Sequence, residues 1–139
     1  MTWERGTHGS TFGGNPVCCA AALATLDLIE GSLMANARSV GAFLMNGVRE
    51  LQRKHDIIGD IRGAGLMIGV HFVRDRATKE PYHGLVPELE KAAFDRGLLL
   101  LGCGRSTIRL APPLVIDEED ATIALRILDE VIASVRVPA

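Results

Sequence analysis

The residues with the clearest chemical potential lie in a polar run from Gly6 to Asn15, which reads G-T-H-G-S-T-F-G-G-N. Ser10 and Thr11 supply two hydroxyl groups there, and the glycines supply unhindered backbone N–H groups just before a predicted helix. Hydroxyls and amides ahead of a helix N-terminus are typical of oxyanion and phosphate sites. The same residue types also form ordinary loops and caps, so the run by itself is compatible with both.

Arg109 is the second residue whose surroundings suggest chemistry. It lies in the apolar segment Ile108-Arg109-Leu110, directly before Pro112-Pro113. A guanidinium among apolar neighbours either pairs with an internal acid or binds a ligand carboxylate, because its planar fork matches a carboxylate in two places at once. From spacing alone, an internal ion pair is the preferred interpretation.

Other motifs that often carry chemistry are incomplete in this chain. Gly63-Ala64-Gly65 resembles the start of a dinucleotide fingerprint, but Ile68 stands where the third glycine belongs and a predicted strand follows. These glycines are therefore predicted to ease a bend. The four histidines lack the spacing of metal ligands, and His71, within the predicted strand, is expected to be structural.

The three cysteines are too few and too close in sequence for a disulfide framework. Cys18 and Cys19 begin a predicted buried helix, where thiols act as small apolar side chains. Cys103 lies between two glycines in a predicted turn, so we expect it to be more exposed and a better candidate for reactivity.

Hydrophobic periodicity predicts the helices and strands that carry these residues. The first helix, 16–30, is apolar on nearly all sides, which predicts burial and a covering partner that so short a chain cannot supply. Asn15 is predicted to cap the first helix and Asp117 the last, and the three acidic residues after Asp117 favour the helix dipole. The order predicts an α+β fold with helices packed on one small, mostly antiparallel sheet. The other predicted elements are helices 32–54 and 86–96 and strands 57–61, 66–72, 98–101 and 107–111, with Gly31 and Gly97 ending the first and third helices.

Length and composition narrow the class of protein. The chain has 139 residues, 47% hydrophobic and 23% charged, with a formal net charge of -2, which is typical of one globular domain. That charge balance gives no reason to expect a nucleic-acid groove or a polybasic membrane patch. The longest apolar run, 17–26, is shorter than the ~20 residues of a membrane span, and the first residues do not resemble a secretory signal. We therefore expect a cytoplasmic protein.

Three blocks in the chain resemble the class III family of pyridoxal-phosphate aminotransferases. They read H-G-S-T-F-G-G-N-P from His8, R-G-A-G-L-M-I-G from Arg62 and T-I-R-L-A-P-P-L-V-I from Thr107. The resemblance implies the C-terminal small domain of the aspartate-aminotransferase-like fold, PLP fold type I. It divides the chain into an active-site loop (1–15), two linking helices (16–54) and a C-terminal α/β small domain (55–139).

The resemblance also implies roles for the two groups above. The family threonine that binds the phosphate of pyridoxal 5'-phosphate in the neighbouring subunit matches Thr11, with Ser10 beside it. The family arginine that binds the substrate carboxylate matches Arg109. The implied partners are an amino donor, a 2-oxo acid acceptor, and either a second copy in a homodimer or a partner carrying the cofactor-binding half.

One family feature is missing from this chain. A transaminase needs a lysine that forms a Schiff base with the cofactor, and in the family that lysine precedes the block at His8. The lysines here are Lys54, Lys79 and Lys91, and none lies in a lysine-bearing motif of the family. We therefore expect this sequence to be the C-terminal portion of such an enzyme, with no transaminase activity by itself.

The predicted function is transfer of an amino group from an amine or amino acid to a 2-oxo acid, with a 4-aminobutyrate-like donor as the best match. Donors of the ornithine, acetylornithine or lysine type stay open, and so does a pyridoxal-phosphate-dependent amino-acid racemase of the same family. The alternative from another class is a non-catalytic interaction module or a split-enzyme subunit that lacks the Schiff-base lysine.

Overall fold

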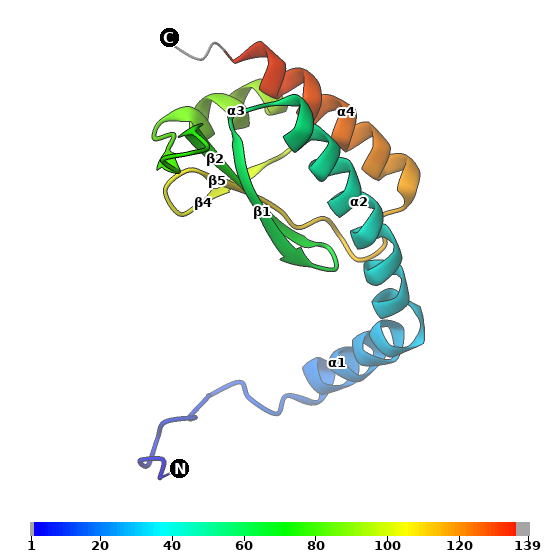
Figure 1. The fold of residues 1–139 in the computed structure, drawn as a ribbon. Coiled ribbons are helices and arrows are strands. Elements are labelled where there is room, and N and C mark those ends of the chain that lie inside the picture. The colour runs from blue at the N-terminus through cyan, green and yellow to red at the C-terminus, as the bar shows by residue number, and fades with distance from the viewer. Residues whose placement is uncertain (1, 136–139) are drawn as a thin grey trace. The chain divides into compact units, whose positions relative to one another are not determined.

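The structure, a computed structural model, describes residues 2–135 and divides them into two compact units, one ending at Leu33 and one beginning at Met34. The first unit holds a loop segment, helix α1 and a π-helical turn, η1. The second holds helices α2 to α4 and five strands (Figure 1). Residues 136–139, at the end of the predicted small domain, lie outside the described residues, and the three-segment division stays a prediction. The bounds are α1 Pro16–Leu28, η1 Ile29–Leu33, α2 Met34–Lys54, β1 Ile58–Ala64, β2 Met67–Asp75, β3 Glu80–Pro81, α3 Leu85–Phe94, β4 Leu101–Cys103, β5 Thr107–Leu110 and α4 Glu118–Ser134.

The strands form one antiparallel sheet in the order β1-β2-β5-β4, with the short β3 paired to β2. This confirms the predicted α+β fold. Strand β3 was not predicted, because its two residues lie in a segment that reads as a charged loop. Strand β4 begins at Leu101 and not at the predicted 98. The N–H of Leu98 instead donates to the carbonyl of Ala93 at 2.9 Å and closes the end of α3, with Gly97 at φ +84 in between.

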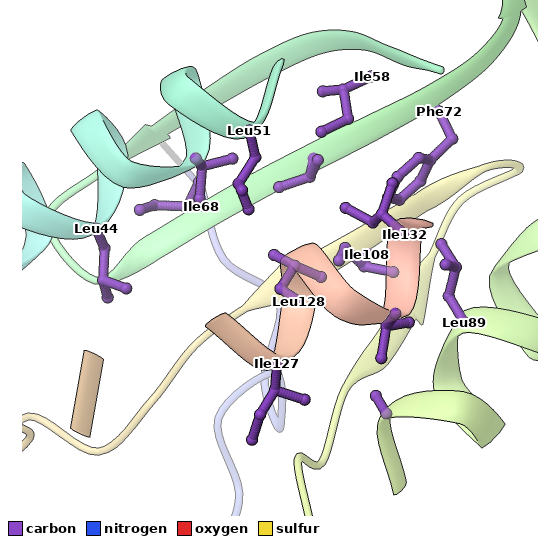
Figure 2. Close-up of a cluster of buried hydrophobic side chains, with 14 of the residues drawn as sticks. Leu44, Leu51, Ile58, Ile68, Phe72, Leu89, Ile108, Ile127, Leu128 and Ile132 are labelled. Carbon is purple, nitrogen blue, oxygen red and sulfur yellow. The ribbon is translucent and has the colours of Figure 1, made fainter. Parts of the chain in front are cut away.

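The hydrophobic core lies between one face of the sheet and helices α2, α3 and α4 (Figure 2). Strand residues alternate between the two faces, so Ile68, Val70 and Ile108 are fully buried. The residues between them, Gly69 and Arg109 among others, face the other way and are half-buried or exposed. Among residues 34–135, the helices thus cover one face of the sheet and leave the other accessible. The core side chains contributed by the helices include Val40, Leu44, Val48 and Leu51 of α2, Leu85 and Leu89 of α3, and Ala121, Ile127, Leu128, Val131 and Ile132 of α4.

The β1–β2 hairpin confirms the predicted bend. Ala64 pairs with Met67, so Gly65 and Leu66 form the turn, and Gly65 adopts φ +55, a conformation that favours glycine. Helix α2 packs directly on this turn. A Cβ added to Gly41 would lie 2.4 Å from the backbone C and O of Gly65, so the close contact requires glycine on the helix as well.

The predicted starts of the first and last helices are confirmed. Oδ1 of Asn15 accepts hydrogen bonds from the N–H groups of Val17 at 3.0 Å and Cys18 at 3.3 Å, and Pro16 begins α1. Oδ1 of Asp117 accepts from the N–H of Asp120 at 2.9 Å at the start of α4. Both caps satisfy N–H groups that have no partner within the helix.

Of the two predictions about α1, the stop at Gly31 was wrong, and the lack of cover within the chain was confirmed. Gly31 does not end the helix, because the chain continues through η1 into α2 without a break. No residue of α1 is buried within the described structure, and large apolar side chains such as Val17, Leu23 and Leu28 are more than half exposed. Cys18 and Cys19 are exposed for the same reason, whereas Cys103 is partly buried, the reverse of the predicted order.

The apolar run 17–26 is by itself too short to span a membrane, but the structure places it in a longer continuous helix, Pro16–Lys54. It contains an 18-residue window with a mean hydropathy of 1.6, none of it buried within the described residues. By length and composition alone it is therefore long and apolar enough to cross a membrane. A helix covered by other parts of a soluble protein has the same properties, so this feature does not by itself identify its surroundings.

Candidate binding residues for substrate and cofactor phosphate

Ser10 and Thr11 lie in an exposed bend of the first unit. Within the part of the chain that the structure describes, neither hydroxyl makes a hydrogen bond, and both are free to bind a ligand. The bend is shaped by short backbone contacts on either side: the N–H of Gly9 donates to the carbonyl of Gly6 at 3.2 Å, and that of Asn15 donates to the carbonyl of Phe12 at 3.3 Å.

The N-terminus of α1 contributes less to an anion site than its position suggested. Pro16 has no N–H group, and the side chain of Asn15 already accepts from the N–H groups of Val17 and Cys18. The donors left for a phosphate are therefore the hydroxyls of Ser10 and Thr11 and the loop amides next to them. Hydroxyls and backbone amides of this kind are the groups that bind phosphate oxygens, so the donor set fits a phosphate.

Arg109 belongs to the second unit, in strand β5, where it is exposed. Among residues 2–135 it forms no ion pair or side-chain hydrogen bond, so the internal ion pair that its spacing favoured is wrong. The reason lies in the strand register. Ile108 and Leu110 point toward the helices, and Arg109 points to the uncovered face of the sheet, opposite Gly69 of β2 and Leu101 of β4.

Arg109 also lines a groove of about 650 Å³. The walls come from 97–101, from 110–113, from 115–116, from the first half of α4 and from Leu44 of α2, and most of the side chains are apolar. Asp120 is the other charged residue among the described lining residues. Arg109 thus borders the groove while its side chain points to the uncovered face of the sheet. A guanidinium next to apolar walls suits a ligand with one carboxylate and a short hydrocarbon chain.

Residues next to Arg109 are held by polar contacts between strands. Nδ1 of His71 lies 2.9 Å from Oγ1 of Thr107 and 3.4 Å from Oγ of Ser106, which is fully buried. Thr107 is two residues before Arg109 on the same face of β5. His71 therefore has the structural role that was predicted for it, since it joins β2 to β5.

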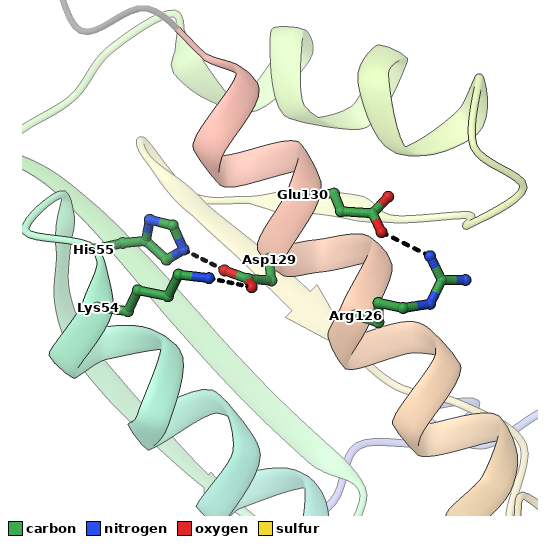
Figure 3. A network of polar contacts seen from close by, with 5 residues as sticks. All are labelled: Lys54, His55, Arg126, Asp129 and Glu130. Carbon is green, nitrogen blue, oxygen red and sulfur yellow. Dashed lines mark hydrogen bonds and ion pairs between the residues drawn. The ribbon is translucent and has the colours of Figure 1, made fainter.

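Two supports of the site were missed in the sequence. The side-chain N–H groups of Asn36 donate to the carbonyls of Leu114 at 2.7 Å and Ile116 at 2.9 Å, which fixes one wall of the groove to α2. The other is a network between the end of α2 and α4 (Figure 3). Asparagine and aspartate in helices give no signal of partners so distant in the chain, and only the tertiary structure identifies them.

Asp129 is the centre of that network. Its carboxylate accepts from Nζ of Lys54 at 2.5 Å and lies 2.6 Å from Nε2 of His55. The hydrogen bond from Lys54 and then that from His55 lower the pKa of Asp129 below its ordinary value. The network joins the end of α2 to α4, the helix whose first half lines the groove, and so holds these two helices together.

Comparisons with known proteins agree with the sequence blocks. A family model described as "Aminotransferase class-III" matches residues 1–132. A 4-aminobutyrate aminotransferase of Mycobacterium bovis is 44% identical over 131 residues, 92% of this chain and 29% of that protein. An alanine/serine racemase of Pyrococcus horikoshii is 42% identical over 132 residues, 91% of this chain and 27% of that protein.

A solved structure is similar over the same length. An amine transaminase from an uncultivated Pseudomonas species, in its PLP-bound form, has a TM-score of 0.86 and 34% identity, covering 93% of this chain and 30% of that one. The chain thus spans less than a third of the length of these relatives. The predicted family and its fold are confirmed: this chain belongs to the class III aminotransferases.

Proposed function

We propose that this chain supplies the substrate-carboxylate and cofactor-phosphate contacts of a pyridoxal-phosphate-dependent transaminase. The enzyme would move an amino group from an amine or amino acid, with a 4-aminobutyrate-like donor as the best candidate, to a 2-oxo acid. The observation that carries the proposal is Arg109, an exposed guanidinium that makes no ion pair among residues 2–135 and lines an apolar groove.

The residues present fit the phosphate end of the cofactor. Pyridoxal phosphate, when bound, supplies the electron sink for chemistry at the carbon that carries the amino group. Thr11, with Ser10 beside it, would donate hydrogen bonds from its hydroxyl to the phosphate oxygens. In a homodimer, Thr11 would do this for the neighbouring subunit. The support is the pair of free hydroxyls and loop amides before α1.

The lysines of this chain support the view that the Schiff-base lysine belongs to another segment. Lys54 pairs with Asp129, and Lys91 of α3 pairs with Asp95 at 2.8 Å. Lys79 lies in the exposed loop between β2 and β3. We therefore propose that the chain alone does not transaminate, and that a complementary segment provides the catalytic lysine.

Arg109 would bind and orient the substrate. Two parallel N–H donors to one carboxylate fix both its position and its plane. The apolar walls would cover the hydrocarbon part of the substrate and exclude water from it, which strengthens the charged contact. A shorter or non-planar cation at this position would lose the second hydrogen bond.

The test is a chimera in which this chain replaces the matching segment of the Mycobacterium bovis 4-aminobutyrate aminotransferase. We expect transamination of 4-aminobutyrate with 2-oxoglutarate. Arg109→Lys should lower kcat/KM for 4-aminobutyrate about ten- to a hundredfold, because a charge-assisted hydrogen bond contributes about 1.5–3 kcal/mol. Butylamine, which has no carboxylate, should be unaffected.

Arg105→Lys, in the turn between β4 and β5, is the matched control, because it makes the same chemical change four residues away on an exposed loop. It should change neither substrate. An equal loss for 4-aminobutyrate and butylamine in Arg109→Lys would mean that Arg109 is structural. A folded chimera that binds the cofactor but turns over no amino donor would favour a non-catalytic module.

A racemase is the second candidate, since the Pyrococcus horikoshii relative is 42% identical over 132 residues. The same chimera distinguishes the two. Conversion of D-alanine to L-alanine without a 2-oxo acid would identify a racemase, whereas amino transfer that depends on the 2-oxo acid would identify a transaminase.

A further inference from the structure

The loop that carries Ser10 and Thr11 is rich in glycine and needs restraints to hold one conformation. Four of the ten residues 6–15 are glycines, and glycine loses more backbone entropy on ordering than any other residue. A loop that becomes ordered only when its ligand binds loses affinity, because binding must offset that entropy. The placement of the two hydroxyls therefore depends on contacts on either side of the loop.

The downstream restraint is the cap of α1. Oδ1 of Asn15 accepts from the N–H groups of Val17 and Cys18, and the N–H of Asn15 donates to the carbonyl of Phe12 at 3.3 Å. These bonds join the end of the loop to the first turn of the helix. Because Phe12 directly follows Thr11, they fix the chain on the C-terminal side of the two hydroxyls.

The upstream restraint is a pair of stacked rings. The indole of Trp3 and the imidazole of His8 have ring centroids 3.8 Å apart and planes inclined by 28°. Between them the chain turns back, because the carbonyl of Glu4 accepts from the N–H of Thr7 at 3.3 Å and from its hydroxyl at 2.7 Å. The stack thus closes a short turn that ends just before the two hydroxyls.

No core explains this stack. Among residues 2–33 none is buried, and Trp3 is 52% exposed. Within the same residues, the side-chain hydrogen bonds all go to the backbone, so the stack of Trp3 on His8 is a contact of a different kind. Since it completes no core, its effect falls on the loop that follows it.

The loop between the two restraints is closely folded. A Cβ at Gly13 would lie 3.1 Å from Cβ of Ser10 and 3.3 Å from its Oγ, so the loop returns toward the serine. The N–H of Gly9 donates to the carbonyl of Gly6 at 3.2 Å. Because Gly9 lies between His8 and Ser10, a displacement of His8 disturbs this bond and moves Ser10 with it.

We propose that Trp3 and His8 are positioning residues for the phosphate contact. Their stack holds the loop so that the hydroxyls of Ser10 and Thr11 are in place before the cofactor phosphate binds. The effect comes from the two facing rings, and the imidazole nitrogens of His8 are not needed for it. The proposal rests on the proposed function and deepens it, because it names what holds the phosphate-binding hydroxyls in position.

The first measurement detects the stack in the full chain. Trp3 is the one tryptophan of the sequence, so the tryptophan bands of the near-UV circular dichroism spectrum report on it alone. His8→Ala should weaken these bands, because the indole loses the ring that fixes its orientation. His8→Phe, which keeps a ring at this position, should retain them. Unchanged bands in His8→Ala would show that the rings do not stack in solution and would overturn the proposal.

The second measurement is cofactor binding by the chimera described above, freed of cofactor beforehand. Titrations with pyridoxal 5'-phosphate and with pyridoxal, which lacks the phosphate, are followed by absorbance and need no turnover. Trp3→Ala and His8→Ala should each weaken binding of pyridoxal 5'-phosphate about two- to tenfold, the effect of losing one aromatic pair. Binding of pyridoxal should stay the same. An equal loss for both ligands would indicate a general structural defect and contradict the positioning role.

Conservative variants separate stacking from direct contact. Trp3→Phe and His8→Phe keep two facing rings and should retain most of the affinity for pyridoxal 5'-phosphate. If His8→Phe loses as much as His8→Ala, the imidazole nitrogens themselves contact the phosphate and the positioning role is wrong. Phe94→Ala is the matched control, because it removes an aromatic ring that is 67% exposed in α3, and it should leave the binding of both ligands unchanged.

A double-mutant cycle identifies the path of the effect. Ser10→Ala and Thr11→Val together remove both hydroxyls and should weaken binding of pyridoxal 5'-phosphate. If the stack acts through these hydroxyls, adding Trp3→Ala to this pair should cause little further loss, whereas fully additive losses would overturn the proposal.

The same cycle distinguishes the two proposals. A loss on removal of the hydroxyls with none in Trp3→Ala would overturn the positioning role and leave the proposed function intact. No loss on removal of the hydroxyls would contradict the phosphate contact of the proposed function, and the positioning role with it.

Discussion

Replacing Gly41 by alanine tests how helix α2 is fixed to the β1–β2 hairpin. The added Cβ would lie 2.4 Å from the backbone C and O of Gly65, about 1 Å closer than the 3.4 Å at which ordinary contact begins. Gly65 has φ +55 in a two-residue turn, so its backbone cannot rotate aside without breaking the turn. The helix must therefore move away from the hairpin, and this loosens the core between them.

The expected loss of stability follows from two opposing effects. Overpacking of this kind costs about 1–3 kcal/mol, and the upper part of that range applies because the obstructing atoms are backbone. Alanine in place of glycine stabilises a helix by about 1 kcal/mol. The free energy of unfolding should therefore fall by about 1–2 kcal/mol, measured by urea denaturation of the full chain with far-UV circular dichroism.

Gly47→Ala in the same helix is the control, because it brings the same gain in helix propensity. Its Cβ would meet Cδ1 of Leu125 at 2.2 Å, the end of a flexible, half-buried side chain that can turn toward solvent. The stability should change by less than about 1 kcal/mol. If Gly41→Ala proves as stable as Gly47→Ala, the contact between α2 and the hairpin is not what requires glycine.

Three further changes test other features of the structure. Because Lys54 and His55 lower the pKa of Asp129, ionised Asp129 stabilises the fold at neutral pH, and this stabilisation is lost as pH falls through the lowered pKa. Asp129→Asn should therefore make the free energy of unfolding fall less steeply at acid pH, and an unchanged dependence on pH would contradict the network. Asn36→Ala removes two hydrogen bonds to the groove wall and should lower the free energy of unfolding by about 1–3 kcal/mol. A smaller loss, measured by urea denaturation, would mean that contacts other than those of Asn36 hold the wall in place. Exposed apolar residues of α1 should make the chain self-associate, so Leu23→Glu, at a side chain 64% exposed, should shift sedimentation toward monomer, and a wild-type chain that is monomeric at all concentrations would refute this.

Features that depend on residues close together in the chain could be predicted from the sequence. Asn15 and Asp117 could be identified as caps because a cap bonds to N–H groups two or three residues away. The turn at Gly65 and the buried faces of α2 and α4 likewise follow from local conformation and periodicity. The family could be identified from three blocks, which also suggested Thr11 and Arg109; their roles stay predictions.

Contacts between residues distant in the chain became clear only from the fold. Spacing favoured an internal ion pair for Arg109, but strand register turns the guanidinium to the uncovered face of the sheet, because neighbouring residues of a strand point in opposite directions. Strand β4 begins later than predicted because the N–H of Leu98 bonds to the end of α3. Asp129 contacts Lys54, which lies 75 residues earlier in the chain. Such contacts arise from the packing of elements against each other, which no local pattern encodes.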